Sequence, residues 1–173
     1  MPNATASQTI GPYWHLLEDA SWADLTRFGA RGERITLTGA VLDGDGKPCA
    51  DACVEIWQSD PPSSDIFPGF GRSNTDSQGV FRFVTVRPGP VPGRGNAQQA
   101  PHIALCIFSR GLMRGLVTRA YFHGEALNQT DPLLTSIEDL ARRTTLIARP
   151  IGEAIWRMDV RLQGAGETVF LDV

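Results

Sequence analysis

Two residues with clear chemical potential stand at the two ends of one apolar segment. His102 follows a loop rich in proline and glycine, and Arg110 follows the uncharged run from Ile103 to Phe108. An imidazole can bind a metal ion, and a guanidinium keeps its positive charge and suits an anionic substrate or an acidic group of a partner. Loops carried by rigid strands often hold binding and catalytic groups. For His102 on this segment alone, a hydrogen-bonded structural histidine is the simpler interpretation.

A second pair of side chains suited to metal binding occurs further along the chain. Tyr121 and His123 lie two positions apart, at the end of a predicted strand from Leu116 to Phe122. Residues two apart in a strand share one face of the sheet. Together with His102 they form the alternative metal site of this chain. The simpler interpretation is a strand end at which the tyrosine packs in the core.

The N-terminal stretch is unusual for its aromatic residues. Gly11-Pro12 interrupts regular structure, and Tyr13 follows at once. An arm that carries aromatic residues docks on its own domain or on a partner. We interpret residues 1–33 as this arm and a connecting segment, in which Ser21 begins a short helical turn that ends at Gly29.

The elements that must position these residues are predicted to be strands. Apolar and polar residues alternate with a period of two in several segments, and Asp43 to Gly46 is a strong turn signal. The run 103–108 is expected to be buried on both faces, and residues 59–79 are expected to form a long loop. The predicted strands begin at Arg34 and continue with 53–58, 80–86, 103–108, 116–122, 144–148, 154–162 and 168–173.

One short helix is predicted between residues 128 and 143. Asp131-Pro132 opens it, and Ser136 with Asp139 resembles a capping box in which aspartate replaces the usual glutamate. The pattern as a whole predicts an all-β fold, an antiparallel β-sandwich with long loops, an N-terminal arm and short helical segments. We expect residues 1–173 to form a single domain.

Composition excludes several classes of function. Of the 173 residues, 42% are hydrophobic and 20% are charged, which is ordinary for a globular protein, and the formal net charge of −3 argues against nucleic acid as a partner. No apolar run is long enough for a membrane span, and residues 1–15 lack the pattern of a signal peptide. Three cysteines, Cys49, Cys53 and Cys106, cannot all pair with one another. We therefore expect reduced thiols and a cytoplasmic location.

Two segments carry a resemblance to a known family. The run PGPVPGRGNAQQAPHIALCIFSRG, residues 88–111, resembles the active-site segment of the intradiol ring-cleaving dioxygenases, and SQTIGPY, residues 7–13, resembles their N-terminal segment. The similarity extends across nearly the whole chain and implies a β-sandwich fold. It also implies chemistry at a non-haem Fe(III) ion held by two tyrosines and two histidines.

The metal ligands of that family are mostly absent from this chain. Residue by residue, the tyrosine of the active-site segment falls on Val91, and the two histidines fall on His102 and Ala104. An arginine just before the histidines falls on Gln99, and residues 59–79, where the other tyrosine ligand belongs, contain no tyrosine. The resemblance therefore implies vestigial metal positions, with neither a metal ion nor a catalytic residue on this chain.

The resemblance also implies a role for a chain without iron. Some members of the family pair related alpha and beta chains, in which beta carries the iron and alpha completes the substrate pocket. The alpha pattern matches TIGPY and FSRG here, so Gly11, Pro12, Tyr13 and Arg110 are implied to bind the substrate. A side-chain-poor Gly-Pro backbone suits the approach of a flat ring. The implied partners are a homologous beta subunit in a larger hetero-oligomer, with 3,4-dihydroxybenzoate and O2 as substrates.

Two other functions remain open at this point. The first is a self-sufficient metalloenzyme that uses His102 with Tyr121 and His123. The second is a non-catalytic β-sandwich that serves as a structural or carbohydrate-binding module. Without the resemblance, Arg110 is most simply a partner in a surface salt bridge.

Overall fold

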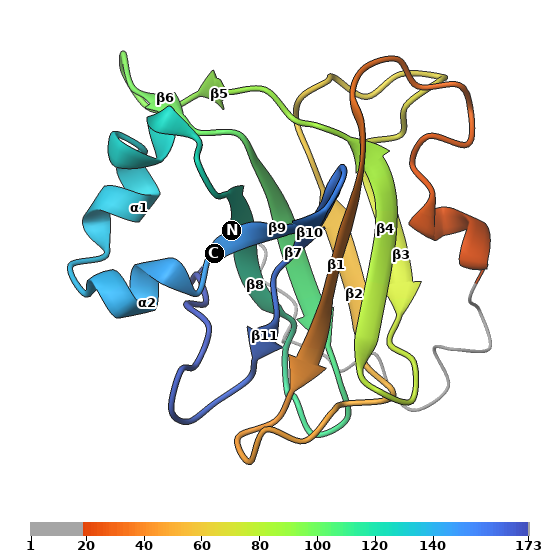
Figure 1. The fold of residues 1–173 in the computed structure, drawn as a ribbon, viewed down its shortest axis with the longest axis vertical. Helices are drawn as coiled ribbons and strands as arrows, with labels where there is room; N and C mark the ends of the chain where they lie inside the picture. Colours follow the sequence, from red (N-terminus) through yellow and green to blue (C-terminus); the bar gives the residue numbers. More distant parts are fainter. Residues whose placement is uncertain (1–18, 173) are drawn as a thin grey trace, which may run out of the picture.

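The computed structural model describes residues 19–172, and most of the regular structure in them is β (Figure 1). Several short strands are joined by turns, and two short α-helices and two 3-10 helices fill the connections. In chain order the elements are η2 (Ala20–Ala23), β1 (Arg34–Leu42), β2 (Cys53–Trp57), β3 (Phe70–Asn74), β4 (Val80–Val86), β5 (Val91–Pro92), β6 (Gln98–Gln99), β7 (His102–Phe108), β8 (Leu116–Phe122), η3 (Ala126–Gln129), α1 (Pro132–Ser136), α2 (Leu140–Thr144), β9 (Ile147–Gly152), β10 (Ile155–Arg157) and β11 (Val160–Arg161).

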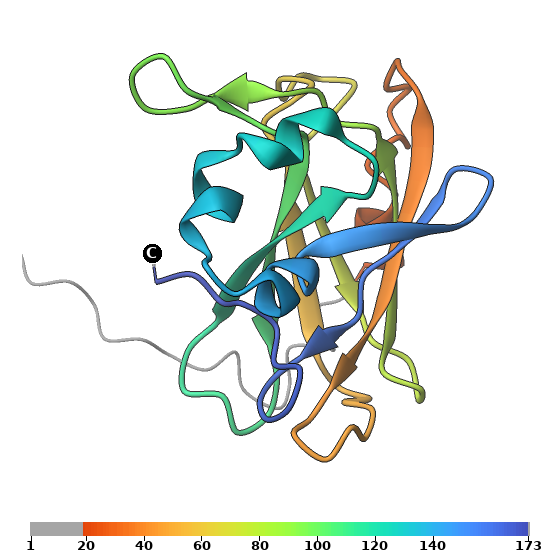
Figure 2. The same cartoon turned by 60° about the vertical axis from the view of Figure 1, so that its left-hand side comes forward.

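Nine of the strands form one continuous sheet that folds over on itself. Its order is β11-β1-β10-β9-β8-β7-β2-β3, and β4 pairs with β1. Figures 1 and 2 show the layer that holds β1 and β4 set against the layer that holds β2, β7 and β8. Buried side chains from both layers make one core cluster. The prediction of an all-β sandwich is confirmed.

The sandwich contains parallel pairings as well as antiparallel ones. β1 runs parallel to both β10 and β11, and β8 runs parallel to β9. The segment after β8 contains η3, α1 and α2 before the chain returns in β9. A long connection of this kind lets a strand return in the same direction, whereas a tight hairpin enforces the antiparallel one. The predicted strand 154–162 thus meets β1 in parallel, which departs from the purely antiparallel sandwich that the sequence predicts.

β1 lies so close to the crossing C-terminal chain that one position must be glycine. A Cβ atom added at Gly39 would stand 1.8 Å from the carbonyl oxygen of Met158. The backbone of Met158 donates a hydrogen bond to the Thr38 carbonyl oxygen at 3.0 Å, which fixes this approach. Glycine inside a strand often marks such a close backbone contact.

β7 differs from its expectation on one face. Ile103, Leu105 and Ile107 are buried in the core, as predicted. The side chains that alternate with them, Ala104 and Cys106 among them, are only partly buried, so the run is not buried on both faces. Residues 103–108 lack charge because small and apolar residues occupy the partly buried outer face of β7. That face does not pack into a second core.

The predicted long loop of residues 59–79 contains a strand, β3, which the sequence did not reveal. A Cβ atom at Gly71 of β3 would come within 2.5 Å of the Leu25 side chain, which is fully buried. Leu25 thus fills the space that a strand residue would otherwise occupy. Because the core atoms come from another segment, the sequence FGRSN carries too few apolar residues to be recognised as a strand.

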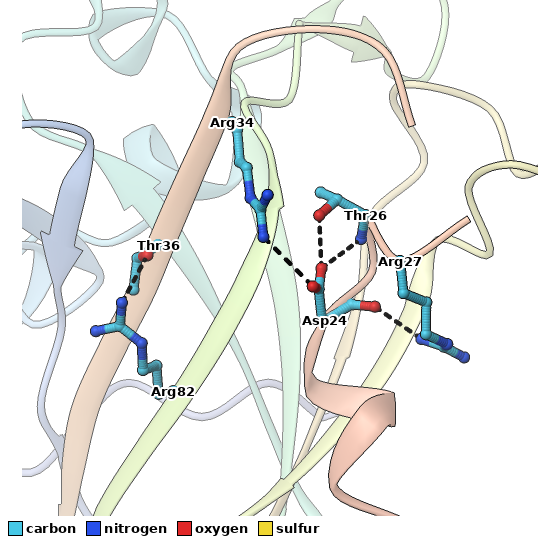
Figure 3. A network of polar contacts seen from close by, with 6 residues as sticks. All are labelled: Asp24, Thr26, Arg27, Arg34, Thr36 and Arg82. Carbon is cyan, nitrogen blue, oxygen red and sulfur yellow. Dashed lines mark hydrogen bonds and ion pairs between the residues drawn. The ribbon is translucent and has the colours of Figure 1, made fainter. Parts of the chain in front are cut away.

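The segment before β1 is tied to the sheet by polar contacts. The Asp19 carboxylate, not Ser21, caps the short helical turn, because it accepts from the Ser21 N–H at 2.9 Å. Figure 3 shows the carboxylate of Asp24 accepting from the backbone N–H and hydroxyl of Thr26 and from Arg34. The Leu25 N–H then donates to the Val84 carbonyl oxygen in β4 at 2.8 Å. These contacts hold Leu25 at its core position.

Two short helices, rather than one, occupy residues 132–144. Asp131 caps α1 and Pro132 stands at its start, as predicted. Asp139 caps α2 by accepting from the Ala141 N–H at 2.8 Å, so the expected capping box with Ser136 is wrong. The Ser136 hydroxyl instead donates to the Leu133 carbonyl oxygen. Among residues 19–172, no helix is long and apolar enough to cross a membrane.

The closing strands are shorter than predicted. Residues 144–146 belong to the end of α2 and the turn after it. Of the predicted strand 168–173, the described residues 168–172 contribute one isolated bridge, from Leu171 to Val117. The predicted strand 154–162 is divided into β10 and β11. At the division the Asp159 carboxylate accepts from the Ala40 N–H at 2.9 Å. A side chain there replaces the backbone acceptor, so the ladder is interrupted.

Candidate functional site

The positions that the family resemblance assigns to metal ligands, Val91, His102 and Ala104, lie around the start of β7 and the hairpin before it. Val91 in β5 pairs with Gln99 in β6, and His102 pairs with Tyr121 in β8. His102 and Ala104 alternate with the buried core residues of β7, so both belong to its outer face. Figure 2 shows the β5–β6 hairpin above α1, at the same end of the sheet.

These positions do not fit a ferric ion. A ferric ion favours anionic oxygen ligands together with imidazole, but the side chains of Val91 and Ala104 contain no donor atom. Only His102 remains, and its Nδ1 lies 2.8 Å from the Ala100 carbonyl oxygen. No group of three or more histidine, cysteine, aspartate or glutamate residues that could hold a metal ion occurs between residues 19 and 172.

His102 has the environment of a structural histidine. Because a carbonyl oxygen can only accept, the Nδ1–H of His102 is the donor to Ala100. Its ring packs against the ring of Tyr121, with 5.4 Å between centroids. Burial lowers the pKa of His102, which favours the neutral ring.

The alternative metal site of Tyr121 and His123 is not assembled. Tyr121 is fully buried in β8, whereas His123 lies beyond the end of that strand and is exposed. The predicted shared face therefore does not extend to His123. The Tyr121 hydroxyl donates to Asp131 Oδ1 at 3.1 Å, and burial raises the pKa of this phenol. A protonated, hydrogen-bonded phenol is a poor metal ligand.

A polar network that sequence reasoning missed lies beside the vestigial positions. Arg119 in β8 donates from Nη1 to Gln99 Oε1 at 2.7 Å and to the Tyr121 hydroxyl at 3.2 Å. Asp131 is fully buried and accepts from the Ala100 N–H at 2.8 Å as well as from the first residues of α1. The only signal in the sequence was the spacing of Arg119 and Tyr121, two apart on one strand. The remaining members come from distant segments.

Arg110 lies at the opposite end of β7, in a turn. Its side chain is 74% exposed and forms an ion pair with Asp51, as the simpler interpretation proposed. The pair lines a pocket of about 570 Å³, together with Asp43, Gly44, Pro48, Cys49, Ala50, Ser109, Gly111, Leu112, Leu162 and Gln163. An exposed ion pair contributes little to stability, so this guanidinium can exchange its partner easily. The other predicted substrate residues, Gly11, Pro12 and Tyr13, lie outside the described residues.

This chain is similar to known dioxygenases. A family model described as dioxygenase matches residues 18–164. The protocatechuate 3,4-dioxygenase alpha chain of Pseudomonas putida is 40% identical over 97% of this chain and 96% of its own length. The beta chain of that enzyme from Burkholderia cepacia is 32% identical over 94% of this chain and 77% of its own.

A solved structure supports the fold. The dioxygenase domain of a dioxygenase and carbohydrate-binding fusion protein from Streptomyces sp. SirexAA-E is 25% identical, with a TM-score of 0.65 over 94% of this chain and 97% of that domain. The relatives also include enzymes named as hydroxyquinol 1,2-dioxygenase and as intradiol ring-cleavage dioxygenase. With the family match over residues 18–164, the full-length similarity and the shared β-sandwich, this chain belongs to the intradiol ring-cleaving dioxygenase family.

Proposed function

We propose that this chain is the alpha subunit of a protocatechuate 3,4-dioxygenase. With a homologous beta subunit it opens the ring of 3,4-dihydroxybenzoate between the two hydroxyl groups, using O2, and forms 3-carboxy-cis,cis-muconate. The observation that carries the proposal is the 40% identity to an alpha chain across 97% of this chain, combined with metal positions that hold Val91 and Ala104.

The proposal assigns the non-haem Fe(III) ion to the beta subunit. In this chain two of the ligand positions, Val91 and Ala104, carry side chains without a donor atom. The imidazole of His102, at the third position, is already hydrogen-bonded to the Ala100 carbonyl oxygen. The 32% identity to a beta chain supports a partner with a related fold, which suits pairing of two similar sandwiches. The family chemistry at the iron would then belong to beta, and this chain would bind and orient the substrate.

Arg110 is the described residue to which we assign contact with the substrate. Its guanidinium is permanently charged and can bind a carboxylate through two parallel hydrogen bonds. In this structure it pairs with Asp51, and both residues line the 570 Å³ pocket. Because Arg110 is far from His102 along β7, it would serve a pocket completed by another chain. Gly11, Pro12 and Tyr13 are proposed to contribute to the same pocket on the basis of the alpha-chain pattern.

The proposal includes a cytoplasmic location, one domain spanning residues 1–173 and assembly with the beta subunit into a larger hetero-oligomer. The thiols of Cys49 and Cys106 support the location, because neither is in a disulfide. Burial raises the pKa of both thiols, to about 11 for Cys106, which keeps them protonated and unreactive near neutral pH.

The experiment compares this chain purified alone with the same chain co-produced with a beta chain from the same organism. Iron content, visible absorbance and O2 uptake with 3,4-dihydroxybenzoate are measured for each. The expected result is a colourless chain with less than about 0.1 iron per protein when alone, and a coloured, active complex, because ferric tyrosinate absorbs visible light.

Two results would contradict the proposal. Stoichiometric ferric iron in the isolated chain would show that it has a metal site of its own. A beta chain with full activity that neither binds this chain nor gains from it would favour a non-catalytic β-sandwich. The affinity between the two chains, measured by sedimentation, separates this second case from simple loss of assembly during purification.

A further inference from the structure

A second pocket lies at the end of the sheet opposite Arg110, beside the vestigial metal positions. It has a volume of about 480 Å³ and is open to solvent, within the size range of sites for small ligands. The β5–β6 hairpin, β8 and α1 enclose it, and Figure 2 shows α1 and the hairpin side by side. The lining residues are Gly93, Arg94, Ala97, Gln99, Arg119, Pro132, Leu133 and Ser136.

The charge of Arg119 is not neutralised by an ion pair within residues 19–172. Its hydrogen bonds leave from Nη1 alone and end on two neutral oxygens, those of Gln99 and Tyr121. No aspartate or glutamate in the described part of the chain forms a salt bridge with it, and the other N–H groups donate to no residue there. The side chain is half-buried, where an unpaired cation is unfavourable. Binding of an anion to this guanidinium would supply the missing ion pair.

Gln99 holds this guanidinium in place. Its Nε2 donates to the Pro92 carbonyl oxygen at 2.9 Å across the hairpin, so its Oε1 is turned toward Arg119. The Tyr121 hydroxyl, whose proton is directed to Asp131, offers Arg119 only a lone pair. Both contacts therefore orient Arg119 without a direct ion pair, because the buried Asp131 carboxylate faces it only through the Tyr121 hydroxyl.

A second cation and an apolar wall complete the pocket. Arg94 lies in the turn of the β5–β6 hairpin, is exposed and forms no salt bridge with any residue from 19 to 172. Pro132 and Leu133 supply apolar surface from α1, and Ala97 adds to it from the hairpin turn that also carries Arg94. Two unpaired guanidinium groups beside an apolar surface match a carboxylate attached to an apolar body.

We propose that this pocket binds a small organic carboxylate with an apolar body, such as an aromatic acid, through Arg94 and Arg119. Arg119 receives the carboxylate in a fixed orientation, and Arg94 closes over it from the hairpin. Pro132 and Leu133 contact the apolar part. The site belongs to this chain alone and takes part in no bond-breaking step.

The test uses the full chain without its proposed partner and 4-fluorobenzoate as the probe, observed by ¹⁹F NMR. We expect saturable binding with a dissociation constant below about 1 mM, which is weak for a specific ligand. Arg94→Gln and Arg119→Gln should each weaken binding by about tenfold or more, because each removes a charge-assisted contact. Arg31→Gln, an exposed arginine outside the pocket, is the matched control and should change nothing.

The proposal is overturned if 4-fluorobenzoate does not bind at 10-fold above that concentration, or if both variants bind it like the parent chain. If the neutral 4-fluorobenzyl alcohol binds equally well, the carboxylate charge is not needed for binding. If inorganic phosphate displaces the probe equally strongly, the apolar body is not needed. Arg94→Gln changes an exposed hairpin residue, so it remains informative if Arg119→Gln fails to fold. Since no beta chain or iron is present, the result is independent of the proposed dioxygenase assembly.

Discussion

His102 is the first residue of β7, and Arg110 lies two residues beyond the other end of the same strand. The seven residues of β7 rise by about 3.3 Å each, which separates the two ends of the strand by roughly 20 Å. A single small substrate cannot touch both residues within this chain. The vestigial metal positions and the proposed substrate arginine therefore belong to two different places on the surface. This separation is what an alpha-beta enzyme requires if Arg110 serves a pocket on its partner.

Replacement of Arg110 by alanine should reduce turnover of the alpha-beta complex without releasing its iron. Loss of one charge-assisted contact to the substrate is expected to lower kcat/KM by about 10- to 100-fold. Arg114→Ala is the control, since Arg114 is another exposed arginine near the end of β7 and pairs with Asp172 on the surface. Unchanged steady-state kinetics, with iron content unchanged, would argue against contact between Arg110 and the substrate.

Asp131 should be far more important for stability than Asp139, although both cap short helices. Asp131 is buried and also accepts from the Ala100 N–H and the Tyr121 hydroxyl, so Asp131→Ala leaves buried donors unpaired. We expect a loss of about 3–5 kcal/mol in the free energy of unfolding. Asp139→Ala removes only an exposed cap and should lose about 1 kcal/mol. Urea denaturation measures both, and similar losses would show that the network around Asp131 is weak.

His102 should make stability depend on pH in the acid direction. Burial lowers the pKa of His102 from its ordinary value of about 6.5, so below that pH the unfolded state binds a proton that the folded state resists. The free energy of unfolding should therefore fall as the pH decreases from about 7 to about 5, by at most about 1.4 kcal/mol per pH unit.

The variant His102→Gln should flatten this part of the stability profile, whereas His123→Gln, at an exposed position, should retain it. Urea midpoints measured at several pH values give the comparison. A profile of equal slope in both variants would assign the acid sensitivity to carboxylates instead.

The Gly39→Ala substitution should prevent β1 from packing against the C-terminal chain. The added methyl group would stand 1.8 Å from the Met158 carbonyl oxygen, and backbone cannot rotate away as a side chain can. We expect destabilisation of at least about 3 kcal/mol. Gly152→Ala in β9 is the control, because its nearest neighbour would be an ordinary 3.6 Å away. The midpoints of thermal unfolding of the two variants give the comparison. Equal midpoints would mean that the contact between β1 and the Met158 backbone can widen to admit a methyl group.

The strands with regular alternation could be predicted from sequence because their own side chains make the core. β4 and β8 are examples, and β1 lies where predicted. β3 could not be predicted, because Leu25 supplies the core atoms opposite Gly71. The division between β10 and β11 was equally hidden, since it depends on the Asp159 side chain contacting Ala40, a residue far away in sequence.

The candidate site was predictable only where a motif lies in one segment. The absence of ligands at Val91 and Ala104 can be read from the sequence once the family resemblance is recognised. Arg119 acquires its significance from Gln99 and Tyr121 in three dimensions, and no local pattern marks an unpaired cation. The prediction that Tyr121 and His123 share one face of the sheet was wrong because β8 ends at Phe122, before His123.

The pairing of β1 with the C-terminal strands has a consequence for biosynthesis. β4 can join β1 early, but the parallel partners of β1 are translated much later, and the Ala40–Asp159 contact alone joins residues 119 positions apart. At about 5–20 residues per second, one edge of β1 waits roughly 6–24 s on the ribosome for β10 and β11. During that interval an unpaired, apolar strand edge is exposed to other nascent chains, so this strand is where chaperones would be expected to engage the growing polypeptide.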